Sequence, residues 1–388
     1  MAMVQGVRTT DVVGSSLAKR DVYETIFNID PYQTPITQFA LAGKIAKRKV
    51  GNYKFEWMED LLVSHTDSAT VATTTLTATD YTKYKLGSLV LFPSTNQTMR
   101  VTATPSTTSV TVARADSASA ITTVSTAETV LIFTDSYAEG SAAAVAISTQ
   151  ATFPYNYTQI LKKAVAMSGT QMAMVDYGGS DWTNQRIKAT KEFKLAIERM
   201  GIYGHRYQTA TAGAYLNYSG GLMDATIGIT NTSQYTGYAA FADETYFFNT
   251  YLKNLFAKGS GRKRLYMGSD ALMTVNDYSK IKVQTTPAEK IYGVNVRTII
   301  VPWGEAELIW QPMLEQWYYP SYCLGIDADP DYLKYAYLSG NGENRDMQYQ
   351  TDVGTNGVDG RTDQYLAEIA WQFSCGSQGV HRMCYPGA

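Results

Sequence analysis

The longest regular pattern of apolar and polar positions in the chain lies between Ser180 and Gly204. Its apolar residues recur at gaps of three, four or seven positions, which places them on one face of a helix. These residues are Trp182, Ala189, Phe193, Ala196, Met200 and Tyr203. Ser180 or Asp181 can cap the first free amides, while Gly201 and Gly204 loosen and then end the helix. The pattern predicts a helix over 180–204, about 35 Å long, against which other elements pack.

Charged side chains lie mainly on the other face of this predicted helix. They are Lys188, Lys191, Glu192, Lys194, Glu198 and Arg199. Lys188 and Glu192 stand four positions apart, as do Lys194 and Glu198. One interpretation is therefore an exposed face with ion pairs worth ~0.3–0.5 kcal/mol each. The local excess of cations supports a second interpretation, non-specific contact with phosphate.

Short stretches of alternating apolar and polar residues dominate the region from Tyr81 to Gly140. They begin at Gly87, Thr98, Ser109 and Glu128, and turns rich in Pro, Ser, Thr and Asn separate them. This spacing, without a helical pattern, predicts a small β-sandwich or barrel. The stretch 60–80 has few large apolar residues, so we expect an extended loop or hairpin that neighbours order.

The remaining pattern mixes helices and strands. Amphipathic helices are predicted at 243–257, with Phe247, Tyr251, Leu252 and Leu255 on one face, and from Ser269 onwards. A short element is expected to end near 168–170. Strands are predicted at 53–59, 264–269, 294–301, 307–311, 332–338 and 364–374.

Composition narrows the class of protein. The 388 residues suffice for two or three domains. The net charge of -2 indicates neither nucleic-acid binding nor membrane binding. Tyrosine is abundant at 29 residues, which suits broad protein–protein contact but also a soluble β-rich protein. The cysteines Cys323, Cys375 and Cys384 are odd in number and form no Cys-x-x-Cys pair, so we expect a reducing compartment. We expect no signal peptide and no membrane span, because no apolar run is long enough.

The search for catalytic chemistry yields little. His65, His205 and His381 share no metal-ligand spacing, and no phosphate-binding glycine loop occurs. The run Asp327–Asp331 resembles the start of a calcium loop but fails the later ligand positions, which leaves a polar turn as the alternative. The basic runs 44–49 and 262–264 are either phosphate contacts or solvated turns. We therefore expect no catalytic residues, no cofactor and no enzyme activity.

A series of short motifs, in a fixed order, resembles one family. They are Ile29-Asp30-Pro31 with Thr34-Pro35, Glu56-Trp57, Ala138-Glu139-Gly140, Asn156-Tyr157-Thr158-Gln159-Ile160, Ser168-Gly169-Thr170, Glu198 to Gly204, and Gly220-Gly221-Leu222. In this order they resemble the major head (capsid) proteins of tailed bacteriophages, specifically the podophage-type group that carries a β insertion. The resemblance runs from about residue 20 to the C-terminus and weakens over 292–338, where Trp310-Gln311-Pro312 stands in place of a clearer family pattern.

The resemblance implies an α+β, Hong-Kong-97-type capsid fold with an inserted small all-β domain. In that fold a long spine helix lies on a β-sheet, beside an axial domain, an extended loop and an N-terminal arm. The implied division is an N-terminal arm at 1–49, an extended loop at 50–80 and 141–158, an inserted β domain at 81–140, a peripheral domain at 159–205 and 331–388 with the spine helix at 180–204, and an axial domain at 206–330.

The resemblance also implies a function. The chain would assemble with itself into hexamers and pentamers of an icosahedral shell around double-stranded DNA, with a portal and with scaffolding, cement or decoration proteins as further partners. It would be assembled in the host bacterial cytoplasm and reside in the virion. The side chains implied to face DNA are Arg186, Lys188, Lys191, Lys194 and Arg199. The competing hypotheses are a tail-fibre or surface-adhesion binding module and an enzyme with an unfamiliar site.

Overall fold

A computed structural model describes most of the chain beyond its N-terminal segment. The described residues are 33–106, 109–116, 120–174, 180–211, 213–224, 230–235, 244–282, 289–291, 294–316, 320–354 and 357–386. The chain divides into two compact units, unit 1 (Met1–Trp57 and Pro154–Ala388) and unit 2 (Met58–Phe153). Most of the predicted N-terminal arm, residues 1–32, lies outside the described residues.

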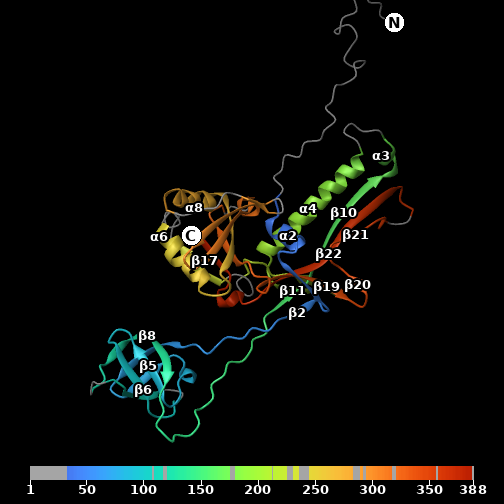
Figure 1. Ribbon diagram of the computed structural model, residues 1–388. Helices are drawn as coiled ribbons and strands as arrows, with labels where there is room; N and C mark the ends of the chain where they lie inside the picture. Colours follow the sequence, from blue (N-terminus) through green and yellow to red (C-terminus); the bar gives the residue numbers. More distant parts are fainter. Residues whose placement is uncertain are drawn as a thin grey trace, which may run out of the picture. The chain divides into compact units, whose positions relative to one another are not determined.

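The first sheet of unit 1 carries the long helix. Its strands are, in spatial order, β1 (Ala46–Val50), β19 (Leu333–Gly340), β22 (Gly360–Phe373) and β10 (Gln159–Ser168), with β20 (Glu343–Asn344) beside β19 and β21 (Gln348–Gln350) beside β22. Helix α4 (Asp181–Tyr203) lies along β10 and β22, which confirms the predicted helix (Figure 1). The element expected to end near 168–170 is the strand β10, followed by the short helix α3 (Gly169–Ala173).

The second sheet of unit 1 is larger. Its strands are, in spatial order, β13 (Thr230–Tyr235), β23 (Arg382–Pro386), β18 (Cys323–Asp327), β14 (Arg262–Met267), β17 (Gly304–Trp310), β16 (Val294–Val301) and β15 (Glu289–Ile291). The predicted helix at 243–257 is present as α6 (Glu244–Tyr246), a π-helical turn η2 (Phe247–Leu252) and α7 (Lys253–Phe256). Its predicted apolar face is buried, together with residues of α8 (Ser269–Lys282), against this sheet.

Strand β23 departs from the predicted division of the chain. It falls within the range 331–388 that we assigned to the peripheral domain, yet it pairs with β18 and β13 of the second sheet. The short 3-10 turn η3 (Gly376–Gln378) separates it from β22 of the first sheet. A boundary at 331 therefore does not separate the two sheets, because the last strand of the chain returns to the second one.

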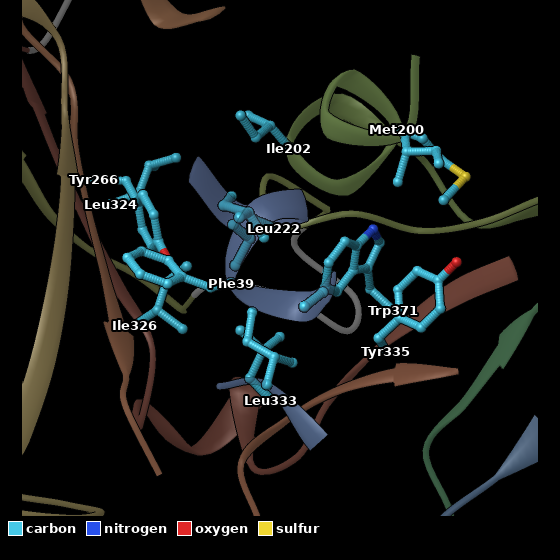
Figure 2. Close-up of a cluster of buried hydrophobic side chains, with 14 of the residues drawn as sticks. Phe39, Met200, Ile202, Leu222, Tyr266, Leu324, Ile326, Leu333, Tyr335 and Trp371 are labelled. Carbon is cyan, nitrogen blue, oxygen red and sulfur yellow. The ribbon is translucent and has the colours of Figure 1, made fainter. Parts of the chain in front are cut away.

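A single apolar cluster joins these elements (Figure 2). It contains Phe39 of α2 (Pro35–Leu41), Met200 of α4, Trp371 of β22 and Tyr266 of β14. A Cβ atom on Gly201 would stand 2.7 Å from Nε1 of Trp371, so this glycine admits the indole ring rather than merely loosening the helix. Helix α2 and β1 thus belong to the core of unit 1, although both lie in the range predicted as an arm.

Two strand pairs and a short helix complete unit 1. The pairs are β2 (Lys54–Glu56) with β9 (Tyr155–Tyr157), and β11 (Tyr207–Thr211) with β12 (Ala214–Tyr218). Helix α9 (Pro312–Gln316) follows β17. The pair β2–β9 brackets the point where the chain leaves unit 1 for unit 2 and returns.

Unit 2 is a closed β-barrel. Its strands are, in order around the barrel, β3 (Thr66–Ala72), β4 (Thr75–Ala78), β7 (Val110–Arg114), β6 (Gln97–Val101), β5 (Ser88–Phe92) and β8 (Val124–Asp135), with the 3-10 turn η1 (Tyr81–Lys83) after β4. The stretch 60–80 was expected to be an extended loop or a hairpin that neighbours order, and β3 and β4 form such a hairpin, which pairs with β8 and β7. Its small side chains alternate inward and outward, so Ala69, Val71 and Leu76 are buried in the barrel. The barrel therefore begins before residue 81.

Candidate functional site

The predicted DNA-facing residues are spread around α4. Lys188 and Arg199 are exposed, whereas Lys191 and Lys194 are half-buried. Arg186 lies on the side of the helix that faces the sheet, where its guanidinium stands 4.8 Å from the centre of the Tyr349 ring. The structure therefore leaves Lys188 and Arg199 as the most accessible cations of the predicted set.

Glu198 is the main correction to the predicted polar face. Its carboxylate is fully buried, because α2 packs on that side of α4. Oε1 accepts hydrogen bonds from Ile36 N at 3.0 Å and Gln311 Nε2 at 2.6 Å, and Oε2 accepts from Thr37 N at 2.7 Å and Thr37 Oγ1 at 2.6 Å. Burial raises the pKa of this carboxyl, and these donors oppose the rise. The carboxylate ties α2 and the segment before α9 to the long helix.

Glu192, which was predicted to pair with Lys188, also has a different partner. Glu192 forms its salt bridge with Lys163 of β10 rather than with Lys188 one turn away. Between β10 and α4 lies an open groove of about 570 Å³, whose lining includes Lys163, Gln185, Lys188 and Glu192. With Glu198 buried and Glu192 engaged by Lys163, the exposed surface of α4 has fewer unopposed acidic groups than the sequence pattern indicates.

The basic run 262–264 is part of a strand rather than a solvated turn. It lies in β14, where Lys263 is fully buried with Nζ 2.6 Å from Asp327 Oδ2. Arg264 pairs with Glu307 at 3.0 Å. Exposed Arg262 pairs with the same carboxylate at 2.8 Å. The sequence could not show this arrangement, because each anion comes from a distant strand.

Most of the basic run 44–49 is likewise part of a strand, and only exposed Lys44 lies in the bend before it. Lys47 and Arg48 lie in β1, which pairs in parallel with β19. Lys47 Nζ stands 2.8 Å from Asp346 Oδ2, and Arg48 Nη1 donates to Gln372 Oε1 at 2.5 Å. These contacts give both cations a structural partner on the first sheet.

The acidic run Asp327–Asp331 is organised around protein donors. Asp327 Oδ2 accepts from Lys263 Nζ and from Ser260 N at 2.7 Å, and Oδ1 accepts from Asp329 N at 2.9 Å. Burial alone would raise the pKa of Asp327, but the hydrogen bonds from Lys263 and Ser260 outweigh it and hold that pKa below its usual range. Within the described ranges, no cluster of His, Cys, Asp and Glu side chains could hold a metal ion.

Exposed apolar side chains mark a surface that the sequence pattern did not single out. In unit 2, Leu62 is 94% exposed, Met58 73% and Phe153 57%. They lie in the two segments that flank the barrel, 58–65 and 136–153, which have little regular structure beyond the bridge between Glu59 and Thr152. The signal available in the sequence was the occurrence of large apolar residues in stretches without helical or strand periodicity.

The sequence as a whole matches the family model described as SU10 major capsid protein over residues 6–378. The chain belongs to the SU10 major capsid protein family. This family favours a shell-forming structural protein over the tail-fibre, adhesion and enzyme hypotheses. A search of curated proteins found no match.

Solved capsid structures resemble this capsid protein along nearly their whole length. The capsid of cyanophage A-1(L) is 10% identical with a TM-score of 0.51, and the likeness covers 97% of this chain and 99% of that one. The capsid of the native GTA particle is 10% identical with a TM-score of 0.48, covering 99% and 100%. The capsid of the Myoviridae phage XM1 is 9% identical with a TM-score of 0.47, covering 99% and 100%. The likeness to the cyanophage protein shows a phage-capsid-like fold.

The family establishes the role of the protein at the level of the particle. It is a major capsid protein of the tailed-phage type, a virion component that associates with copies of itself to form the shell. Among the helices of the described residues, none is long and apolar enough to cross a membrane.

Proposed function

We propose that this capsid protein has the Hong-Kong-97-type fold and forms an icosahedral head around packaged double-stranded DNA. The long helix α4 on the first sheet supports a spine helix on a peripheral domain. The second sheet with its helices fits the axial domain. Hexamers and pentamers of the chain would be the building units, assembled in the bacterial cytoplasm with a portal and with scaffolding, cement or decoration proteins.

The observation that carries this proposal is the exposure of the two segments flanking the barrel. Leu62 and Met58 expose most of their surface in stretches that bury no core of their own. Residues 141–151 have no helix or strand, and nearly all are exposed. Apolar side chains in such positions contribute stability only when another surface covers them. We therefore assign these two segments to the extended loop, and we propose that a neighbouring subunit covers them.

Replacing Leu62 with Asp tests this assignment. The side chain is exposed in the isolated chain, so the variant should fold with an unchanged thermal midpoint. A charge buried at a subunit contact should instead prevent assembly. We expect soluble, unassembled protein in sedimentation velocity and an absence of shells in electron micrographs.

Leu131→Asp is the control, because Leu131 is another leucine of unit 2 with exposed surface, 39% of it, but lies in β8 of the barrel. This variant should still assemble. Normal shells from Leu62→Asp would remove the flanking segments from the subunit contact, and loss of shells from both variants would make the effect unspecific to these segments.

A further inference from the structure

Two of the three cysteines of the chain face each other in the second sheet. Cys323 begins β18, Cys384 lies in β23, and the two are direct partners in the antiparallel ladder. Both are fully buried in one apolar cluster that includes Tyr251 of η2. Directly opposed residues of an antiparallel pair point to the same face of the sheet. The two thiols therefore share one pocket.

The contacts of Tyr251 locate this pocket. The Cys323 thiol donates to Tyr251 Oη at 3.6 Å, and the same hydroxyl donates to Arg382 O, two residues before Cys384, at 3.0 Å. Burial raises the pKa of Cys323 to about 12, and burial together with the neighbouring Cys323 raises that of Cys384. Both groups are thus protonated thiols close to one another.

We propose that Cys323 and Cys384 are a latent disulfide pair, which a disulfide-type oxidant such as oxidised glutathione closes into a bond between β18 and β23. Opposed residues of an antiparallel ladder have Cα atoms about 4.5 or 5.5 Å apart. Disulfides span about 4.4–6.8 Å between Cα atoms. The two strands already hold the residues at a suitable spacing, so closure needs only a small approach of the Cβ atoms.

The chemistry balances with glutathione disulfide as the oxidant. One thiol loses its proton and its thiolate attacks the glutathione disulfide, which gives a mixed disulfide and one glutathione thiolate. The second cysteine, after losing its proton, attacks the mixed disulfide at the protein sulfur and displaces the second glutathione thiolate. The protein loses two electrons and two protons, and oxidised glutathione becomes two molecules of reduced glutathione.

Burial makes this reaction conditional. The thiolate is the reactive form, and the raised pKa values keep it scarce in the folded chain. Glutathione reaches the pair only when β23 separates locally from β18. The thiols therefore persist in a reducing cytosol and close slowly outside it. A shell protein would meet both settings, a consequence that rests on the proposed function.

Closure would join distant parts of unit 1. The bond would close a loop from 323 to 384 that contains β19 and β22 of the first sheet. A crosslink that closes a long loop restricts the unfolded chain and so stabilises the fold. The oxidised chain should have the higher thermal midpoint.

The test uses the full chain, incubated with oxidised glutathione in buffer and in a series of sub-denaturing urea concentrations that open β23. Samples are then unfolded without reductant, alkylated with iodoacetamide, and measured by intact mass and peptide mapping. We expect a linked pair of peptides containing Cys323 and Cys384, faster formation with added urea, and a higher thermal midpoint that reductant reverses.

Cys375→Ser is the matched control, because the remaining cysteine lies outside the shared pocket, in the turn before η3. This variant should crosslink as the unaltered chain does, and Cys384→Ser should not. Three outcomes would overturn the proposal: all thiols still alkylated after incubation in urea, glutathione adducts on the pair without closure, or a crosslink that uses Cys375 or a second chain.

Discussion

At the scale of single residues, the Glu198 carboxylate holds α2 against α4. We expect Glu198→Ala to lower the free energy of unfolding by about 3 kcal/mol or more, because buried donors on Ile36, Thr37 and Gln311 lose their acceptor and each orphaned donor costs about 1–3 kcal/mol. Urea unfolding of the unassembled chain measures the loss. Thr37→Val removes one hydroxyl donor and should cost about 1 kcal/mol. Equal stability of both variants would show that the network does not act through Glu198.

His381 gives the fold a dependence on pH. The ring is fully buried, with Nδ1 accepting from Asp327 N at 3.3 Å and Nε2 facing Tyr332 O at 3.3 Å. Burial lowers its pKa from 6.5 to about 4. The negative charge of nearby Asp327 opposes this fall, and the positive charge of Lys263 adds to it. Between these values the unfolded chain binds a proton that the folded chain does not. Stability should therefore fall as the pH drops from 6.5 towards 4, by about 1.4 kcal/mol per pH unit.

The variant His381→Gln isolates this contribution. Its amide can occupy the same hydrogen bonds but cannot gain a proton. Urea midpoints at pH 7 and pH 4.5 should differ less for the variant than for the unaltered chain. An identical pH dependence of both proteins would mean that other groups carry the acid sensitivity.

Local sequence could not predict the environments of Glu198, Lys263 and Asp327. By helical periodicity Glu198 falls with the charged face of α4, and only the packing of α2, more than 160 residues earlier, buries it. Lys263 and Asp327 likewise read as a basic triplet and an acidic turn, although the register of β14 and β18 makes them opposite neighbours. Such pairings depend on contacts between distant segments, which a pattern along the chain does not contain.

At the scale of elements, α4 presents a testable charged surface. Replacing Lys188 and Arg199, its exposed cations, with Gln should leave empty shells intact but make DNA-filled particles release DNA at lower salt. The reason is that contacts with phosphate weaken as salt rises and add together over many subunits. The measurement is the fraction of DNA that the particles retain as the sodium chloride concentration is raised.

Lys253 and Lys258 are the control pair, because both are exposed but lie in and directly after α7 rather than on α4. Their double replacement with Gln should leave the salt tolerance unchanged. If the α4 double variant retains DNA as the unaltered chain does, this face of the helix has no role in DNA contact.

The elements themselves follow closely from local pattern. The helix at 180–204, the helical run at 243–257 and the strands β16, β17, β19 and β22 lie where periodicity predicts them. The strands that the pattern did not identify individually are those with few large apolar residues. Strands β3 and β4 consist mainly of Thr, Ser and Ala with one Val and one Leu, so their apolar face becomes evident only when the barrel closes around it.

At the scale of the whole molecule, unit 2 should fold without unit 1. Residues 58–153 enclose their own core, in which Leu76, Val90, Phe92 and Met99 are completely buried. Expressed alone, this fragment should give a β-type circular dichroism spectrum and a cooperative thermal transition. The shorter fragment 81–140 should not, because it lacks β3 and β4, which pair with β8 and β7. A random-coil spectrum from 58–153 would contradict an independent barrel.

The strand pair β2–β9 has a consequence for how such a chain can change over time. Lys54 pairs with Tyr157, and Trp57 N donates to Pro154 O at 3.0 Å, so the chain leaves unit 1 and comes back at neighbouring positions of one ladder. A tight turn could join these ends, so unit 1 is a continuous scaffold that can fold without unit 2, whereas shell assembly still needs the flanking segments 58–65 and 136–153. The barrel also begins and ends at neighbouring positions, because Thr66 pairs with Leu131 and Ile132 N donates to His65 O at 2.7 Å. A foreign domain whose termini lie close together could therefore replace the barrel alone and be displayed on a shell that keeps both flanking segments.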